Sequence, residues 1–482
     1  MRILVTQKNF EECLTKVCAT NGHACDTETF GVHFTPVKWL PAPGIFSFQI
    51  SDESDDYYFD FHHSKDRLGL SEKQRLYREY LECPKRLTIW HNAKFDLNQL
   101  RAEGCQVAGE VYCTRALARV ANNTEPGGLG LDALAAKYLG AGKIELKAYL
   151  NEHGHFSKVL APSGKEVALL HFDRAPLEML VEYGCKDTRL TLQLFQWQQA
   201  RFVEIQTKYD ALGIKKTIRA VVDNEIKLTK ILAGMDFKGV KVNVPYCREA
   251  LAYEMAEYQR IEQELDALAA PHVPQKLDWL SAKQLKTLFD ALNLPYSYTE
   301  KGNATFDKDA LEGSDTELAR LILQYRFHYK RAHTYFENYV NMVDDVGFIH
   351  CDSQQAGTNT GRMSYWTPNL QNVPKRTDKD GAKYKVRSCF ISEEGGFFAD
   401  IDYKAAEYHM MFDYAGEESM ITKVKAGLDV HVATMNELGI DNRDAAKTMN
   451  FGLLYGMGVK SLVSKLGVSE TRAKQLKYRY FE

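Results

Sequence analysis

The first two hundred or so residues alternate short apolar runs with segments of helical periodicity. The runs at 45–50, 57–61 and 86–90 read IFSFQI, YYFDF and RLTIW, and they are rich in residues that favour strands. Residues 129–140, LGLDALAAKYLG, instead space their apolar positions as a helix does. Such alternation is typical of an α/β domain.

From about Thr217 the pattern changes to long amphipathic helices. Two series of apolar residues recur at steps of three or four, and we interpret both as core-facing stripes of an antiparallel helical subdomain. A coiled-coil interface with a partner is the alternative. The series are Met255, Tyr258, Ile261, Leu265 and Leu268, and then Leu318, Ile322, Tyr325, Tyr329, Ala332, Phe336, Tyr339 and Val343.

The remaining segments are assigned from local composition. The polar, glycine-containing stretch 299–313 predicts a loop. Residues 347–402 predict a strand-rich segment, and residues 415–482 predict helices. A length of 482 residues suggests about three domains.

Composition narrows the class of protein only modestly. The net charge is −3, but residues 421–482 hold ten Lys and Arg against six Asp and Glu, which permits contact with nucleic acid there. A solvated charged surface is the alternative. Ten cysteines occur as singles without a close Cys/His quartet for zinc, so we expect reduced thiols. The start has no long apolar run, so neither a secretory signal nor a membrane span is expected, and the cytoplasm of a cell or an infected cell follows.

Three groups of acidic residues stand out in the amino-terminal part. Asp26 and Glu28 follow a predicted strand, and alternation puts them on the same side of an extended chain. Without a basic residue between them they repel unless a cation bridges them. Asp96 follows another β-rich run, in the segment His91–Asp96. Tyr183 and Asp187 are four residues apart and share one helical face.

Together these residues read Asp-x-Glu, Asn-x3-Phe-Asp and Tyr-x3-Asp. The ordered set, over roughly Met1–Phe195, resembles the three motifs of the DEDDy 3′→5′ exonucleases. The resemblance implies a ribonuclease-H-like fold in which Asp26, Glu28, Asp96 and Asp187 hold two Mg²⁺ or Mn²⁺ ions. It also implies that Tyr183 orients the attacking water. We expect Asn92 to support the site, and His23 and His91 to be structural.

A second set of motifs lies in the second half of the chain. Thr358–Ser364 and Pro368–Pro374 resemble the "TGR…NLQN-P" segment of family-A DNA polymerases. By that resemblance Arg362 and Gln371 touch the primer–template from the minor-groove side. Donors there can test base-pair geometry without reading sequence.

Residues 398–403, FADIDY, predict a strand that ends in acid and resemble motif A of the same family. The resemblance makes Asp402 catalytic and the Tyr403 carbonyl a further metal ligand. It makes Glu407 the steric gate against a ribose 2′-hydroxyl, which implies synthesis of DNA over RNA. Asp400 shares the strand face and is the alternative acid. His409 stands where the family usually has arginine.

Motif B is expected as a helix. Arg443, Lys447, Phe451 and Tyr455 follow at steps of four, each step advancing only ~40°, so they share one face. The two cations suit a triphosphate, and the two rings suit a sugar and base. By resemblance Phe451 governs dideoxynucleotide discrimination. An upstream histidine, His431, matches one that meets the triphosphate.

The second metal-binding carboxylate of a polymerase is not found. After Asp444 there is no further aspartate, and after His431 no further histidine, whereas the family carries a His-Asp-Glu motif C well downstream. We expect a naturally split enzyme whose second polypeptide supplies motif C, with a truncated continuous enzyme as the next interpretation. The third is an exonuclease whose polymerase half only grips DNA. We also expect exposed apolar surface around Phe451, Leu453 and Leu454.

The resemblance implies an α/β multidomain protein, a ribonuclease-H-like exonuclease followed by an incomplete polymerase right hand. Its ligands would be primer–template DNA and dNTPs, and a processivity factor is a further candidate partner. The lack of a 5′-nuclease domain ahead of the exonuclease favours a phage replicative enzyme over a bacterial repair enzyme. The expected segments are 1–205 (exonuclease), 206–345 (helical thumb and the start of the palm), 346–415 (palm) and 416–482 (the first part of the fingers).

Overall fold

The computed structural model describes residues 1–31, 44–125, 128–142, 145–160, 166–299, 301–374, 381–403 and 405–481. The chain divides into two compact units, which are Met1–Gly396 and Phe397–Glu482. This boundary lies inside the segment 346–415 that the sequence suggests as one palm region. Among the described residues, no helix is long and apolar enough to cross a membrane.

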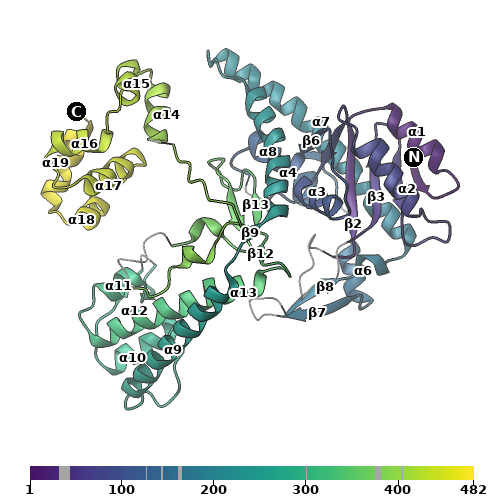
Figure 1. The fold of residues 1–482 in the computed structure, drawn as a ribbon. Helices are drawn as coiled ribbons and strands as arrows, with labels where there is room; N and C mark the ends of the chain where they lie inside the picture. The colour runs from purple at the N-terminus through teal and green to yellow at the C-terminus, as the bar shows by residue number, and fades with distance from the viewer. Residues whose placement is uncertain are drawn as a thin grey trace. The chain divides into compact units, whose positions relative to one another are not determined.

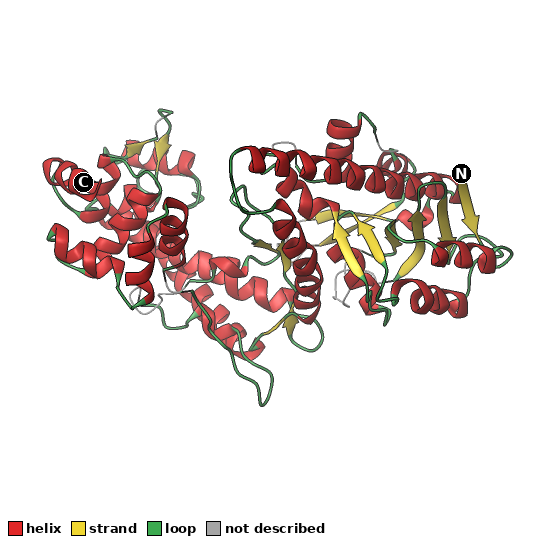
Figure 2. Ribbon diagram, turned by 90° about the horizontal axis from the view of Figure 1, so that it is seen from above, coloured by secondary structure: helices red, strands yellow, loops and turns green. Residues whose placement is uncertain are grey.

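The first unit begins with a six-stranded mixed sheet in the order β1-β4-β3-β2-β5-β6, whose strands are coloured yellow in Figure 2. Pairing is antiparallel on both sides of β3 and parallel for β1–β4, β2–β5 and β5–β6. The α/β prediction for this region is therefore confirmed. The strands are β1 (Arg2–Val5), β2 (His23–Thr29), β3 (Ile45–Ser51), β4 (Asp56–Asp60), β5 (Leu87–Trp90) and β6 (Glu110–Cys113).

Helices cover both faces of this sheet because its strands alternate apolar side chains to either side. Tyr57 and Phe59 of β4 pack into one buried cluster with residues of α1 and α3, whereas Tyr58 packs into another with residues of α7. The helices of this region are α1 (Phe10–Ala19), α2 (Leu70–Leu76) with a π-helical turn (Tyr77–Leu81), α3 (Ala93–Ala102), α4 (Thr114–Ala121), α5 (Leu131–Leu139), α6 (Leu146–Glu152) and α7 (Leu177–Ala211). A hairpin of β7 (Phe156–Leu160) and β8 (Glu166–Leu170) precedes α7.

A helical part follows within the same unit, seen in teal and green in Figure 1. Its helices are α8 (Ile218–Lys238), α9 (Val244–Ala269), α10 (Ala282–Ala291), α11 (Lys308–Glu312), α12 (Glu317–Lys330), a π-helical segment (Arg331–Glu337) and α13 (Asn338–Met342). The two apolar stripes meet in the cores of this part, as the sequence predicts. Leu268 is the exception at 44% exposed, and its neighbour Ala269 is buried in its place.

The described residues of 299–313 are more regular than the predicted loop. Strand β11 (Ala304–Thr305) pairs with β10 (Ser297–Tyr298), and α11 begins at an Asp307 cap whose side chain accepts from the backbone of Ala310. Phe306 and Leu311 are buried. Two apolar side chains among polar neighbours therefore anchor this segment to the helical core.

The described residues of the segment 347–402 form short strands only. β12 (Phe348–Ile349) pairs with β9 (Val240–Lys241), and β13 (Asp352–Gln354) forms a hairpin with β14 (Ser364–Trp366). 3₁₀ turns lie at Leu370–Asn372 and Val386–Cys389. The predicted strand over 398–402 is wrong: these residues have no regular structure, and Ile401 is 91% exposed. A strand needs a hydrogen-bonded neighbour, and the described residues supply none for it.

All regular structure among the described residues of the second unit is helical, as predicted for 415–482. It consists of α14 (Ala406–Ala415), α15 (Glu418–Lys425), α16 (Val430–Leu438), α17 (Arg443–Leu454), α18 (Val459–Leu466) and α19 (Glu470–Phe481). The exposed surface expected around Phe451, Leu453 and Leu454 is not found. Leu453 is buried because α18 and α19 fold back over it, and Phe451 and Leu454 are half-buried. Exposed apolar residues lie instead at Phe397, Tyr403 and Tyr414.

Candidate functional site

Asp26 and Glu28 lie within β2, rather than after a strand. β2 pairs with β3 so that Asp26 lies opposite Gln49 and Glu28 opposite Ser47, with a register shift between Glu28 and Thr29. Both carboxylates therefore point to the same face of the sheet, as the alternation predicts, and the intervening Thr27 points to the other side. Asp26 and Glu28 are half-buried.

Asp96 is carried by the first turn of α3. The helix starts after Asn92, which adopts the left-handed conformation at φ 68°. Asp96 is only 2% exposed, and its Oδ1 accepts hydrogen bonds from the Thr27 backbone N–H at 3.1 Å and the Thr27 hydroxyl at 2.6 Å. Burial raises the pKa of Asp96 to about 7, although both bonds from Thr27 oppose the shift. Thr27 thus ties α3 to the strand that bears the other two acids.

Tyr183 and Asp187 come from the first turns of α7. The helix approaches β3 closely at Gly184, where a Cβ atom would lie 2.8 Å from Cγ of Gln49, so only glycine fits. Asp187 is 5% exposed. Burial, and then the nearby Glu28, Asp187 and Asp26, raise the pKa of Tyr183. Its hydroxyl is therefore protonated at neutral pH, the form that donates a hydrogen bond.

All five residues line one cavity of about 680 Å³, so the structure brings together the complete set predicted from sequence. Among the described residues, no three His, Cys, Asp or Glu side chains converge tightly enough to form a ready-made metal cluster. The donor set nevertheless fits hard divalent cations, because four carboxylates face one space and a cation would offset their mutual repulsion. Asp26, Glu28, Asp96 and Asp187 are the residues that could hold it.

The cavity has walls that the sequence did not indicate. Lys147 of α6 and apolar residues of the β7–β8 hairpin also line it, namely Val159, Val167, Ala168, Leu169 and Leu170. Nothing in the alternating pattern of these short strands distinguishes them from an ordinary hairpin. Thr27 could have been found, because it lies between two candidate ligands.

His23 and His91 are held by hydrogen bonds of structural type. His91 contacts the Thr114 hydroxyl through Nδ1 at 2.9 Å and the Leu129 carbonyl through Nε2 at 3.0 Å, and it also borders the cavity. His23 is 1% exposed and contacts the hydroxyls of Tyr80 and Thr20, each at 2.9 Å. Burial, and then Arg86, lower the pKa of His23 to about 4.

This lowered pKa predicts a loss of stability in mild acid. The unfolded chain binds a proton at His23 near pH 6.5, whereas the folded chain resists it until about pH 4. The free energy of unfolding therefore falls as pH decreases through this window, by about 2 to 3 kcal/mol at pH 4.5 relative to pH 7. We expect the free energy of unfolding of His23→Gln to fall less between pH 7 and pH 4.5, because this variant has no imidazole to protonate. The measurement is a denaturant titration at each pH, with hydrogen exchange of the β2 amides as the readout. His153→Gln, at an exposed histidine, is the control, and equal pH slopes in wild type and H23Q would refute the assignment.

Arg362 and Gln371 lie close together at the β13–β14 hairpin. The backbone N–H of Arg362 donates to the Thr358 hydroxyl at 3.0 Å, which closes a tight turn. The Gln371 side chain donates to the carbonyl of Met363 at 3.3 Å. Both side chains are exposed, so they are accessible to a large ligand.

In the second unit, α17 carries Arg443, Lys447 and Phe451, whereas Tyr455 lies just past its end and is 67% exposed. The four residues therefore share one helical face only up to Phe451. Arg443 donates through Nε and Nη2 to Asp429, at 3.0 and 2.8 Å. Phe451 and Tyr455 border a shallow pocket of about 640 Å³.

His431 is more enclosed than a residue that meets a ligand directly. It is 8% exposed, contacts the amide of Asn450 at 3.1 Å through Nδ1, and packs against the rings of Tyr408 and Phe451. Burial lowers the pKa of His431, so the neutral imidazole is favoured. In this arrangement it supports Phe451.

Asp402 and Tyr403 are exposed in the irregular segment before α14, as is Asp400. Glu407 is half-buried in the first turn of α14. Over the described part of the unit, no hydrogen bond or ion pair joins Asp402 to Arg443 or Lys447. The structure thus groups the α17 residues but does not bring Asp402 to them.

Comparisons with known proteins agree with this division. The family described as "3'-5' exonuclease" matches residues 1–199, and "DNA polymerase family A" matches residues 246–482. DNA polymerase I of Pseudomonas aeruginosa is 29% identical over 501 residues, covering 99% of this chain and 51% of its own length. The thermostable DNA polymerase I of Thermus filiformis is 36% identical over 273 residues, covering 54% of this chain and 32% of its own. The chain thus spans about half the length, or less, of these relatives.

A solved structure supports the same fold. It is described as the POL domain of Pol1 from M. smegmatis in complex with DNA primer-template and dNTP. It matches with a TM-score of 0.75 at 20% identity, over 98% of this chain and 74% of that one. The chain therefore belongs to DNA polymerase family A and carries a 3′–5′ exonuclease domain ahead of its polymerase domain.

Proposed function

We propose that the first domain removes nucleotides from the 3′ end of DNA, with two Mg²⁺ or Mn²⁺ ions as cofactors. The observation that carries this proposal is the single cavity lined by Asp26, Glu28, Asp96, Asp187 and Tyr183. When bound, the metal pair would supply an activated water and neutralise charge on the phosphate.

The residues of the chain have separate roles in this proposal. The four carboxylates hold the cations, and ionised Asp96 is needed, which a bound cation favours by lowering its raised pKa. Protonated Tyr183 donates to the attacking water and fixes its direction. Thr27 holds Asp96 toward the cavity from the neighbouring strand.

For the polymerase half we propose template-directed transfer of dNTPs to a DNA primer during replication. Asp402 and the Tyr403 carbonyl would hold metal, Glu407 would exclude a ribose, and Arg443 and Lys447 would neutralise the triphosphate. Phe451, supported by His431, and Tyr455 would contact sugar and base. Arg362 and Gln371 would contact the primer–template. Their side chains are exposed close to the same hairpin, which supports this role.

This polymerase site needs a second carboxylate, because one acid does not position two metal ions. We propose that it comes from polypeptide other than residues 1–482, with a second chain carrying motif C as our first choice and a continuation of the same chain as the next. The setting that we propose is a phage-type replication enzyme, acting in the cytoplasm of an infected cell with or without a processivity factor.

A second candidate function follows from the exposure of Asp402. An exonuclease whose polymerase half only binds DNA accounts for the solvated, irregular segment around this residue. Such a protein would bind dNTPs weakly with or without a partner.

A gel assay tests these proposals with the 482-residue chain, a labelled primer–template, Mg²⁺ and all four dNTPs. We expect shortening of the primer without extension. Extension by the pure chain would contradict the requirement for a second carboxylate from elsewhere. Absence of shortening on single-stranded and duplex substrates, with either Mg²⁺ or Mn²⁺, would overturn the exonuclease proposal.

A further inference from the structure

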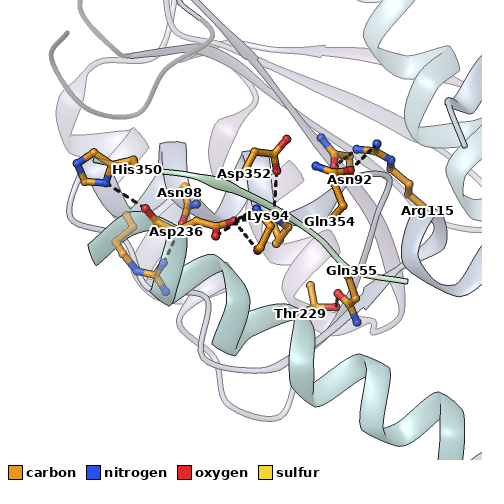
Figure 3. Close-up of polar contacts among 12 residues, drawn as sticks. Asn92, Lys94, Asn98, Arg115, Thr229, Asp236, His350, Asp352, Gln354 and Gln355 are labelled. Carbon is orange, nitrogen blue, oxygen red and sulfur yellow. Dashed lines mark hydrogen bonds and ion pairs between the residues drawn. The ribbon is translucent and has the colours of Figure 1, made fainter. Parts of the chain in front are cut away.

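Four consecutive residues of the polymerase half make polar contacts outside their own hairpin. Asp352, Ser353, Gln354 and Gln355, the 352–355 strip, include all of β13. Three of them are nearly buried, Ser353 at 0% and Gln354 and Gln355 at 8% exposed. Figure 3 shows the strip running between α8 and the starts of two exonuclease-domain helices, α3 and α4.

Lys94 is the first exonuclease residue that the strip holds. It lies in the first turn of α3, where a positive charge opposes the helix dipole, so local helix stability does not explain a lysine there. Lys94 is 9% exposed. Its ammonium donates to Asp352 at 3.2 Å, to the Ser353 hydroxyl at 3.0 Å and to Asp236 of α8 at 2.6 Å. The three acceptors together satisfy its three N–H donors.

Arg115 is the second exonuclease-domain residue that contacts the strip. It occupies the equivalent unfavourable position in the first turn of α4. Its Nη1 donates to Oδ1 of Asn92 at 2.6 Å, and its Nη2 donates to Oε1 of Gln354 at 2.9 Å. The guanidinium thus bridges the strip to the residue that begins α3, and Asn92 itself lines the carboxylate cavity.

Asp236 and α8 lock the strip in place. Asp236 is 3% exposed and accepts from the Ser353 hydroxyl at 2.8 Å and the Ser353 backbone N–H at 3.2 Å. Two residues further along the strip, Oε1 of Gln355 accepts from the Thr229 hydroxyl at 2.8 Å. These contacts fix the position of the strip along α8. Because Lys94 also bonds to Asp236 and to the strip, they fix the position of α3 as well.

The first turns of α3 are therefore held from two directions. Asp96 is tied to Thr27 of β2, whereas Lys94 is tied directly to the polymerase half and Asn92 is tied to it through Arg115. The two tethers act on residues within one turn of each other, so a shift at Asn92 or Lys94 moves the Asp96 carboxylate. Such displacements of about 1 Å cost on the order of 100-fold in rate when they occur at reacting groups.

We propose that the 352–355 strip of the polymerase half completes the exonuclease site, and that Lys94 and Arg115 are positioning residues that transmit its placement to Asp96. The inference rests on the proposed exonuclease function. The exonuclease domain carries all four carboxylates of its own proposed metal site, yet it takes the position of one of them from β13.

The test uses Gln354→Leu in the full chain, which removes the acceptor for Arg115 at a residue outside the exonuclease domain. We expect kcat on a single-stranded oligonucleotide to fall at least about 10-fold with KM within about two-fold, the range seen when a partner of a metal ligand is lost. Gln354→Glu keeps the acceptor and should restore kcat. Arg119→Gln is the matched control, since Arg119 lies on the same helix and contacts Asn359 of the same hairpin but not Asn92.

A second readout separates this inference from the exonuclease proposal. Mn²⁺ affinity, measured by electron paramagnetic resonance without DNA, should weaken in Q354L and not in Q354E or R119Q. If wild type lacks nuclease activity, the proposed function fails and Mn²⁺ affinity alone decides the inference. The inference would be overturned if Q354L kept the kcat and the Mn²⁺ affinity of the wild type. It would also be overturned if R119Q lost as much of both as Q354L does. Should Q354L not fold, Arg115→Gln is put through the same two assays.

Discussion

Replacing Asp26 and Glu28 together by alanine is expected to lower the exonuclease rate by at least about 1000-fold, because two of the four carboxylates that would hold the metal pair are lost. Both residues are half-buried on β2, whose pairing with β3 does not depend on their side chains. The fold should therefore persist, and the effect should appear in kcat. The measurement is the rate of release of 3′-terminal nucleotides from a single-stranded oligonucleotide in Mg²⁺.

A matched control removes two other acids from the same domain. Glu11 and Glu12 are adjacent and exposed on α1, where they pair with Arg75 and Lys16 at the surface. Glu11→Ala with Glu12→Ala should leave the rate within about two-fold of wild type, since exposed ion pairs contribute little. A D26A/E28A protein that retains more than a tenth of the wild-type rate would refute the metal-ligand assignment.

The largest effect on stability is expected at Glu254 of α9. This carboxylate is fully buried, and it accepts from Arg331 at 2.7 Å and from His328 at 2.6 Å. Glu254→Ala leaves the buried guanidinium of Arg331 without its counter-charge, which costs about 3 to 5 kcal/mol. Denaturant titration of the full chain should show this loss in the transition of the helical part of the first unit.

Glu257 provides the comparison on the same helix. Its partner Arg260 is about half exposed, so Glu257→Ala should change the free energy of unfolding by at most about 1 kcal/mol. Equal effects of E254A and E257A would mean that burial does not set the strength of the Glu254 interaction. Glu254→Gln should fall between the two, because it keeps an acceptor but not the charge.

Much of the fold follows from periodicity in the sequence. The strands at IFSFQI, YYFDF and RLTIW and the stripes of α9 and α12 bury their apolar residues as the pattern requires. Local pattern fails where a distant segment decides the outcome. Phe398 to Asp402 alternate as a strand does, but without a pairing neighbour they stay irregular and exposed. Leu453 is buried only because α18 and α19 return over α17.

The candidate site was predictable to a similar extent. The order of Asp26, Glu28, Asp96, Tyr183 and Asp187 marked the cavity in advance, because motif residues must converge for metal chemistry. The 352–355 strip gave no signal, since its polar sequence Asp-Ser-Gln-Gln resembles an exposed turn. Its burial depends on Lys94, Arg115 and Asp236, which are more than a hundred residues away and carry no apolar periodicity.

The contacts of β13 also bear on how freely the two halves can be exchanged between relatives. A chimaera that joins residues 1–199 to the polymerase of another family member would present Lys94 and Arg115 to a foreign hairpin. Natural recombination and domain grafting should therefore succeed mainly where the incoming partner already offers a matching acceptor at the position of Gln354. Across the family, substitutions at the positions of Lys94, Arg115 and Gln354 should occur together, so that the two catalytic modules evolve as one unit.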